Sequence, residues 1–211
     1  MKKPGHSLCP GFFLTRVWPS HIMTGMDKKE LILSEAEKLF AEKGYYGLGL
    51  AELLKRCDIP KGSFYYYFPD GKIQLIQEVL EYSYARMKGR IAEWMALETS
   101  ALEAFSHMAD RLMKGVEHKR MLSSMLLSMI AIESVYLDER VNRTCRRIYA
   151  DWQSDYAAYL ERFGVPGELC HRKAQAVFAL IHGSLISSWV KQDPDDLRQA
   201  RAALTDLFDE K

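Results

Sequence analysis

The sequence predicts an all-α protein of about nine helices, in which three short helices precede a larger helical bundle. Two observations support this fold class. From Asp27 onward, apolar residues recur mostly at helical spacing, and no segment of useful length alternates between apolar and polar residues as a half-buried strand would. With 211 residues, 48% of them hydrophobic, the chain is also long enough to bury a substantial core without disulfide bonds.

The three short helices are marked by their start and stop residues. A capping-box pattern at Asp27 opens the first helix, and Gly44 follows its last periodic residue. The second helix is predicted over residues 50–57 and the third over residues 61–68, with the turn Asp58-Ile59-Pro60 between them. Two short helices joined by so tight a turn predict a helix-turn-helix unit.

The remainder of the chain is predicted to form six longer helices. Gly, Pro, Ser and Asp residues separate them, and Gly164, Pro166 and Gly167 give the clearest break. Their approximate ranges are 72–97, 100–117, 121–136, 138–163, 168–191 and 195–208. We therefore divide the chain into residues 1–26, residues 27–72 with the helix-turn-helix, and residues 73–211 with the bundle.

Composition and charge exclude several classes of protein. The four cysteines lie far apart without a C-x-x-C pair, which argues against a disulfide-rich scaffold or a zinc ribbon and fits a reduced, cytoplasmic setting. Cys145 and Cys170 would sense oxidants only if they were exposed with a lowered pKa. The most apolar run, residues 121–137, contains four serines and Glu133, so we interpret it as a buried helix and not as a membrane span.

The third helix carries the residue types that bind DNA. In a helix-turn-helix unit the second helix of the pair enters the major groove. Lys61 and Gly62 open this helix, where backbone N–H groups and the helix dipole favour a phosphate. Phe64 and Phe68 are expected to anchor it. Ser63 can donate to a phosphate or a base edge, and one or two of the hydroxyls of Tyr65, Tyr66 and Tyr67 are expected to face outward. Lys55, Arg56 and Lys72 add local positive charge.

Net charge adds no support for DNA binding. The formal charge is +1, so any affinity for nucleic acid must come from a local patch. Residues 27–72 contain eight basic and eight acidic residues, so placement matters more than bulk charge. The plainer alternative is a helix-turn-helix-like packing unit whose aromatic residues belong to the core.

The run Ile59-Pro60-Lys61-Gly62-Ser63-Phe64-Tyr65-Tyr66-Tyr67-Phe68 resembles the recognition-helix signature of TetR/AcrR-type transcriptional regulators. Residues 33–44 look like that family's first helix. Residues 68–72 resemble its LmrA/YxaF-like branch, and residues 49–68 are also similar to NemR. The specific match covers roughly residues 27–80. It implies a DNA-binding transcriptional regulator, by family default a repressor, whose C-terminal bundle binds an effector and forms a dimer.

The resemblance also implies residue roles. Lys61 and Gly62 would lie against DNA, Ser63 and Tyr66 would contact bases or phosphates, Tyr65 and Tyr67 would grip the backbone or pack, and Lys72 would bind a phosphate. Two departures stand out. Leu48 and Gly49 replace the Thr or Ser that usually precedes the second helix, and Asp58 replaces a turn glycine that favours positive φ.

An effector pocket is expected in the bundle. Methionines cluster in its first half, and their flexible, polarizable side chains suit a pocket for varied apolar ligands, although ordinary core packing is the alternative for each. Glu133 is either a counter-ion for a cationic ligand or the partner of Arg146 or Arg147. The four bundle histidines, His107, His118, His171 and His182, show no metal spacing, so we expect no metal and no cofactor. The candidate pocket residues are Trp94, Phe105, Met108, Met125, Met129, Glu133, Trp152 and Tyr156.

A homodimer is expected because helix-turn-helix repressors read paired half-sites about 34 Å apart with matching two-fold symmetry. The last two helices offer a wide apolar face. The resemblance implies that this face pairs with its copy across the two-fold axis; the alternative is that it packs within its own chain. The residues of this candidate interface are Phe178, Ile181, Leu185, Ile186, Trp189, Leu204 and Phe208, with Leu197 on the same face.

We therefore predict a TetR-type regulator that binds palindromic double-stranded DNA and is released by a small apolar or amphipathic ligand. A helical enzyme is disfavoured because G-x-S-x-G, P-loop and H-E-x-x-H motifs are absent. The alternative is a ligand-sensing or interaction module that does not bind DNA. Residues 1–26 are interpreted as a disordered leader, as translation from an upstream start codon with Met23 or Met26 as the true start, or as a basic arm that follows DNA.

Overall fold

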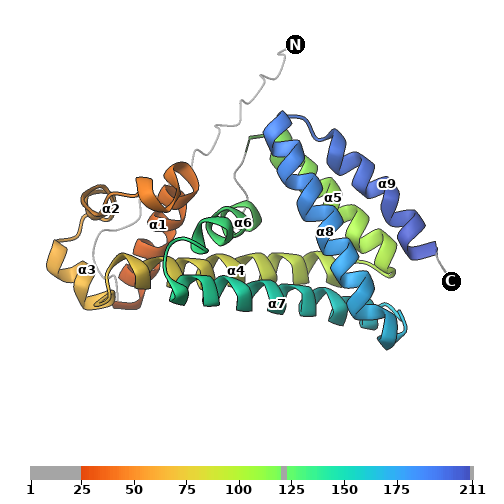
Figure 1. The fold of residues 1–211 in the computed structure, drawn as a ribbon, viewed down its shortest axis with the longest axis horizontal. Coiled ribbons are helices and arrows are strands. Elements are labelled where there is room, and N and C mark those ends of the chain that lie inside the picture. The colour runs from red at the N-terminus through yellow and green to blue at the C-terminus, as the bar shows by residue number, and fades with distance from the viewer. Residues whose placement is uncertain (1–24, 120–122, 210–211) are drawn as a thin grey trace, which may run out of the picture.

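The computed structural model describes residues 25–119 and 123–209, and this part of the chain forms nine helices and no strand (Figure 1). The all-α prediction is confirmed. The helices are α1 (Gly25–Gly47), α2 (Leu50–Cys57), α3 (Lys61–Tyr67), α4 (Lys72–Ala96), α5 (Ala101–Glu117), α6 (Ser123–Ser134), α7 (Glu139–Arg162), α8 (Gly167–Lys191) and α9 (Asp195–Asp209).

Most helix ends follow the local signals in the sequence. Ser100 accepts a hydrogen bond from the Glu103 N–H and caps α5, and Asp138 caps α7 through the Arg140 N–H. The start of α1 differs, because the helix begins at Gly25, two residues before the predicted start. Residues 1–24 of the predicted leader or arm lie outside the described residues.

The helices are arranged around two long ones. α4 and α7 run side by side along the long axis of the molecule, α1 to α3 gather around the start of α4, and α5, α8 and α9 pack together towards the other end (Figure 1). α6 lies between these groups and contacts α1, α4 and α7. It therefore connects α1 with the two long helices.

One continuous apolar core joins the helix-turn-helix to the bundle. It contains Phe40 of α1, Phe64 of α3 and Leu75 of α4, and extends without a break to Trp152 and Tyr156 of α7. A smaller cluster joins α5, α6, α8 and α9 through Val116, Met125, Leu185 and Leu197. Because α4 contributes to the core along its whole length, a shift of this helix would be felt by α1 to α3.

No helix within residues 25–119 or 123–209 combines the length and the apolarity that crossing a lipid bilayer requires.

Candidate DNA-binding surface and ligand cavity

The turn between α2 and α3 has the geometry that the sequence predicts. Asp58 ends α2 in the left-handed region, with φ 49° and ψ 53°, and its N–H donates to the Lys55 carbonyl at 3.3 Å. Asp is one of the few non-glycine residues that visits this region routinely. Pro60 then supplies the fixed φ from which α3 starts.

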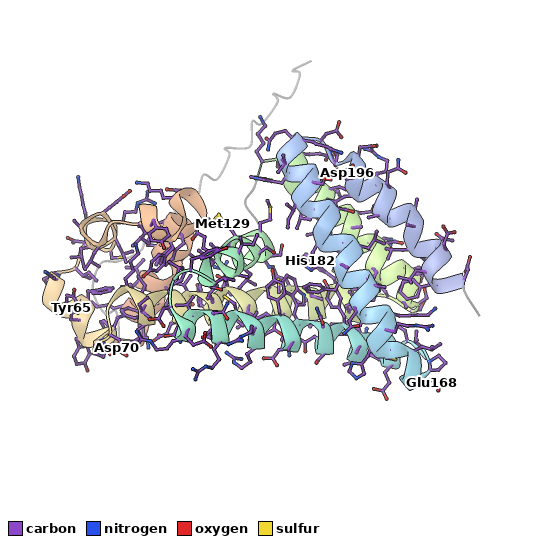
Figure 2. The ribbon with its side chains drawn as sticks, viewed as in Figure 1. Tyr65, Asp70, Met129, Glu168, His182 and Asp196 are labelled. Atoms are coloured by element: carbon purple, nitrogen blue, oxygen red, sulfur yellow. The ribbon has the colours of Figure 1, made fainter. Side chains whose placement is uncertain are left out.

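α3 is anchored on one side and open on the other. Phe64 and Phe68 are fully buried, with ring centroids 5.2 Å apart, so the prediction that they anchor the helix is confirmed. Tyr66 is 80% exposed and Tyr65 43% exposed, and Tyr65 lies at the outer end of the molecule (Figure 2). The other predicted contact residues follow the same division, with Lys61 and Gly62 exposed and Ser63 and Tyr67 half-buried.

Gly62 leaves the start of α3 unobstructed. A Cβ atom placed there would meet nothing within 4 Å, so the protein itself does not require glycine at this position. The absence of a side chain instead lets another molecule approach the backbone closely.

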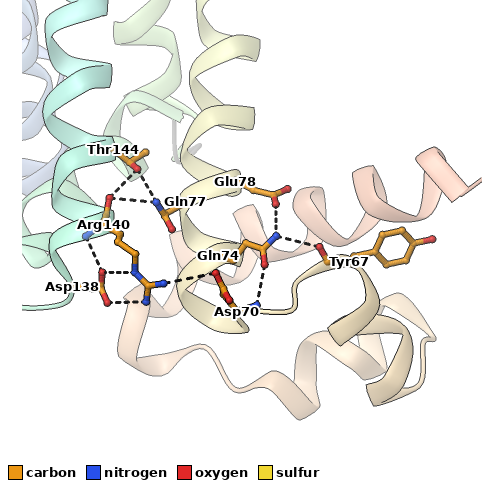
Figure 3. A network of polar contacts seen from close by, with 8 residues as sticks. All are labelled: Tyr67, Asp70, Gln74, Gln77, Glu78, Asp138, Arg140 and Thr144. Carbon is orange, nitrogen blue, oxygen red and sulfur yellow. Dashed lines mark hydrogen bonds and ion pairs between the residues drawn. The ribbon is translucent and has the colours of Figure 1, made fainter.

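A polar network holds the end of α3 against α4 and α7 (Figure 3). Gln74 of α4 donates to the Tyr67 carbonyl at 3.4 Å and to Glu78 at 2.9 Å, while its amide oxygen accepts from the Asp70 N–H at 3.1 Å. Arg140 of α7 lies 3.8 Å from the Asp70 carboxylate. The orientation of α3 is thereby tied to two long helices of the bundle.

Gln77 completes this network one turn further along α4. Its amide donates to the Thr144 hydroxyl at 3.1 Å and to the Arg140 carbonyl at 3.4 Å, which joins α4 to the first turns of α7.

Lys72 is placed differently from the other predicted DNA contacts. Its ammonium donates to the Leu48 carbonyl at 2.8 Å and lies 4.3 Å from the centre of the Tyr45 ring. Burial lowers the pKa of Lys72, and the nearby charge of Glu133 opposes that shift. In this structure Lys72 is half-buried and fastens the α1–α2 connection to α4.

Ion pairs with nearby carboxylates neutralise some of the basic side chains of residues 27–72 and leave others unpaired. Arg56 pairs with Glu42 at 3.0 Å and with Glu52 at 3.1 Å, and Lys43 also pairs with Glu52. Lys55 and Lys61, by contrast, are exposed and form no ion pair within the described residues. The positive charge available beside α3 is therefore small and local.

Glu133 has neither of the partners that the sequence suggested. Arg146 pairs with Glu139, and Arg147 pairs with Glu81 and Asp151. Glu133 instead accepts a hydrogen bond from the Tyr45 N–H at 3.1 Å, just after the kink of α1 at Gly44. It does not line the cavity described below, because the last turn of α6 carries it towards α1, and its assignment to the effector pocket stays a prediction without support from that cavity.

Gly44 makes room for this contact. Its φ is 66°, and a Cβ atom there would lie 3.0 Å from Glu133 Oε1. Both the backbone conformation and the close carboxylate therefore disfavour any other residue at this position.

A cavity of about 430 Å³, measured to its open mouth, lies among α4, α5, α6, α7 and α8. Four of the eight predicted pocket residues line it: Trp94, Met108, Trp152 and Tyr156. The sequence did not single out the remaining lining residues as pocket residues: Met87, Arg90, Ile91, Leu112, Ser124 and His182.

The other predicted pocket residues pack elsewhere. Phe105 is fully buried and stacks on Phe208, Met125 belongs to the smaller apolar cluster, and Met129 packs against the main core. They were predicted from residue type alone, and helical spacing does not tell which side of a helix faces a cavity.

Two polar groups in the cavity wall are buried without a satisfied hydrogen bond. His182 Nε2 has no partner, and the ring of His182 lies 4.2 Å, centroid to centroid, from both Trp152 and Phe178. The Trp152 N–H also lacks a hydrogen bond of normal geometry. It lies close enough to the Tyr156 hydroxyl to lower the pKa of Tyr156 slightly, against the larger effect of burial. Burial lowers the pKa of His182 to about 3 and raises that of Tyr156.

Most residues of the predicted dimer interface lie inside the protomer. Phe178, Ile181, Leu185 and Leu204 are buried, because α8 and α9 use those faces to pack against each other and against α5 and α7. This corrects the prediction for these four residues. Trp189 and Phe208 are half-buried, and Ile186 is 42% exposed.

A different face of α8 is open to solvent. It carries the exposed residues Ala179, Gly183, Ile186 and Val190, spaced four, three and four residues apart, which places them along one side of the helix. A Cβ atom at Gly183 would meet nothing within 4 Å.

Cys145 and Cys170 do not have the environment of redox sensors. Both thiols are buried, and burial raises the pKa of each. Because the thiolate is the reactive form, their surroundings disfavour oxidation.

An anchored helix-turn-helix joined by a long helix to a bundle with a cavity defines the class of helix-turn-helix transcription factors. The family model "Bacterial regulatory proteins, tetR family" matches residues 32–79. The model "Transcriptional regulator LmrA/YxaF-like, C-terminal domain" matches residues 101–203. The chain therefore belongs to the TetR family of bacterial transcriptional regulators and has an LmrA/YxaF-like C-terminal domain. It is a DNA-binding regulator and not an enzyme.

Individual relatives agree with this assignment. The transcriptional regulator LmrA of Bacillus subtilis is 29% identical over 182 residues, which cover 86% of this chain and 97% of LmrA. YxaF of the same organism is 25% identical, covering 81% of this chain and 90% of YxaF. The reduced form of Escherichia coli NemR has the same fold, with a TM-score of 0.75, 24% identity and coverage of 85% and 96%.

Proposed function

We propose that this protein is a homodimeric repressor that binds palindromic double-stranded operator DNA and leaves it when a small apolar or amphipathic ligand occupies the bundle cavity. In this proposal residues 27–72 form the DNA-binding domain and residues 73–211 the effector-binding and dimerisation domain. The protein would act in the cytoplasm, where the chromosome of a bacterium lies.

The observation that carries the DNA-binding part is the two-sided character of α3. Phe64 and Phe68 fix the helix in the core, while Lys61, Gly62 and Tyr66 face solvent. A rigid helix with exposed hydrogen-bonding groups can enter a major groove and contact base edges without the cost of ordering its own backbone. Repression is supported by one relative, the transcriptional repressor NemR of Escherichia coli, which is 41% identical over 70 residues, or 33% of this chain.

α6 supports a route from the cavity to the DNA-binding domain. Ser124 in its first turn lines the cavity, and Glu133 near its end accepts the Tyr45 N–H. A ligand that displaces the start of α6 would therefore move a carboxylate that holds the end of α1. A coupling of about 1–3 kcal/mol lowers operator affinity about 5- to 150-fold.

The open face of α8 supports the dimer. Ile186 and Val190 are exposed apolar side chains, and Ala179 and Gly183 beside them are small enough for a second helix to approach closely. Pairing this face with its copy across a two-fold axis would bury it and set the two α3 helices as a pair.

The test is fluorescence anisotropy of the purified protein with DNA from upstream of its own gene. A scrambled duplex of equal length is the control, and both are titrated at several salt concentrations. Tighter binding to the upstream DNA, with log K falling linearly with log salt concentration, supports the proposal, and the slope gives the number of phosphate contacts.

The variants Lys61→Ala and Tyr66→Ala decide between the two functions considered from the sequence. Both should weaken binding to the upstream DNA if α3 reads it. Equal and weak binding of the parent protein and both variants to both duplexes, repeated with sites from a genome-wide binding experiment, would favour a ligand-sensing module that does not bind DNA.

A further inference from the structure

We propose that the bundle cavity recognises a flat, uncharged, largely apolar ligand that carries one hydroxyl group, and that His182 and Trp152 bind this hydroxyl. The inference rests on the proposed function only in taking the cavity as the effector site. It adds the chemical class of the ligand and the two residues that select it.

The walls of the cavity define the apolar part of the ligand. Trp94, Trp152 and Tyr156 present aromatic surface, and Met87 and Met108 present thioethers. Aromatic rings and polarizable sulfur atoms both pack well against a flat ring system. The volume of about 430 Å³ includes the open mouth, so the enclosed part is smaller and the ligand we infer is small, of about two rings.

The polar part of the ligand follows from the two unsatisfied groups. His182 is 8% exposed, its Nε2 atom is buried without a protein partner, and the Trp152 N–H lacks a hydrogen bond of normal geometry. Both side chains line the cavity, and their ring centroids are 4.2 Å apart. In Figure 2, His182 lies on the side of α8 that faces the middle of the molecule. Buried polar groups are almost always paired, so two of them beside one cavity indicate a polar ligand group there.

The charge state of His182 determines which polar group fits. Burial lowers the pKa of His182 to about 3, so near neutral pH the imidazole is uncharged and offers one lone pair and one N–H. A hydroxyl both donates and accepts, so it can donate to the imidazole lone pair and accept from the indole N–H. A methyl group of similar size satisfies neither.

Charged ligands fit the cavity less well. Among the described lining residues there is no carboxylate that could pair with a cation. Arg111 stacks on Trp94 at 5.0 Å from the ring centre and does not itself line the cavity. A carboxylate placed beside His182 would face an imidazole that carries no compensating charge.

Three naphthalene probes of similar shape test this inference by isothermal titration calorimetry near neutral pH. They are 2-naphthol, 2-methylnaphthalene and 2-naphthoate. We expect 2-naphthol to bind about 10-fold more tightly than either of the others, which corresponds to one hydrogen bond to a buried group. In His182→Phe, whose ring suits the aromatic cluster, the preference for naphthol over methylnaphthalene should fall to about 2-fold or less, because only the Trp152 N–H remains.

Trp152→Phe is the second variant, and it removes the N–H but keeps an aromatic ring. It should lose part of the preference for naphthol, and thermal unfolding curves show whether either variant is folded. Equal binding of naphthol and methylnaphthalene to the parent protein overturns the inference, and so does an unchanged preference in both variants. Tighter binding of 2-naphthoate overturns the uncharged ligand class, and no binding of any probe at its solubility limit overturns the ligand class altogether.

The same titrations separate this inference from the proposed function. If 2-naphthol binds with the expected dependence on His182 but operator affinity does not change, release by ligand is wrong and the recognition of the hydroxyl stands. If a probe lowers operator affinity but binds the parent protein and His182→Phe equally well, release by ligand stands and the proposed role of His182 is wrong.

Discussion

At the scale of single residues, exposure separates the tyrosines that can meet DNA from those that build the protein. Tyr66 is 80% exposed on α3, whereas Tyr156 is 1% exposed and forms part of the cavity wall. Tyr65 is intermediate, with its ring 5.9 Å from the Lys61 ammonium. The proposed contacts of α3 with DNA therefore depend first on Tyr66.

Tyr66→Ala should weaken operator binding without destabilising the fold. Loss of one base or phosphate contact costs about 1–3 kcal/mol, which is about 5- to 150-fold in affinity. The free energy of unfolding should change by less than about 0.5 kcal/mol, because the side chain makes few contacts. Anisotropy and urea denaturation measure the two quantities.

Tyr136→Ala is the matched control for this substitution. Tyr136 is 85% exposed, but it lies in the turn between α6 and α7. It should leave both operator affinity and stability unchanged. An equal loss of operator affinity in the two variants would show that α3 has no special part in binding.

His182 should make the stability of the protein depend on pH. Its pKa is lowered to about 3 in the folded protein, so between the ordinary histidine pKa and that value the unfolded chain binds a proton that the folded chain does not. The contribution of His182 to the free energy of unfolding is therefore largest above the ordinary histidine pKa. It falls as the pH is lowered, by at most about 1.4 kcal/mol per pH unit.

The His182→Phe variant should lack this component of the pH dependence. Urea denaturation at a series of pH values between about 7 and 5 measures it, and His171→Gln at an exposed position of α8 is the control. Parallel curves for the parent protein and His182→Phe would show that folding does not lower the pKa of His182.

At the scale of elements, α6 is the short helix that links cavity and DNA-binding surface. Its first turn provides Ser124 to the cavity, and its last turn provides Glu133 to the kink of α1 at Gly44. The second connection is polar and runs through Gln74 and Gln77 of α4 (Figure 3). The position of α3 therefore depends on helices that also build the cavity.

Glu133→Ala should loosen the contact between α6 and α1. It leaves the Tyr45 N–H without its acceptor and removes the charge near Lys72, so we expect a loss of stability of about 1–3 kcal/mol and weaker operator binding. Glu133→Gln keeps a carbonyl oxygen as acceptor and should recover most of the stability. Urea denaturation and anisotropy measure both effects.

Glu139→Ala serves as the control, because Glu139 is an exposed carboxylate that pairs with Arg146. An exposed ion pair contributes only about 0–1 kcal/mol. If Glu133→Ala is no more damaging than Glu139→Ala, α6 does not hold α1 through this carboxylate.

At the scale of the whole molecule, the proposed dimer decides whether two α3 helices can act together. The open face of α8 is the surface on which such a dimer would form, since the larger apolar side chains of α8 and α9 are used within the protomer. Small residues on that face would let two α8 helices pack closely, and Ile186 and Val190 would supply buried apolar area.

Ile186→Glu should dissociate the dimer, because each subunit would then place a carboxylate against its copy at the two-fold axis. Light scattering after gel filtration should give half the molar mass of the parent protein, and operator affinity should fall steeply. Leu97→Glu is the control, since Leu97 is 73% exposed at the end of α4. A dimer that persists in Ile186→Glu would show that another face pairs.

The sequence by itself determined the parts of this protein that depend on local interactions. Helix positions follow from apolar periodicity and from caps such as Ser100, and the helix-turn-helix follows from Asp58 and Pro60 between two short apolar patterns. The outward position of Tyr66 also follows, because the buried residues Phe64 and Phe68 fix the faces of α3.

Only the tertiary structure decided which neighbour each side chain meets. It placed Glu133 at Tyr45, the Lys72 ammonium at Leu48, and His182 in the cavity wall, and it buried Ile181 and Leu185 within the protomer. The physical reason is that helical periodicity reveals an apolar stripe but not the partner that covers it. That partner depends on contacts between residues far apart in the chain, which no local pattern encodes.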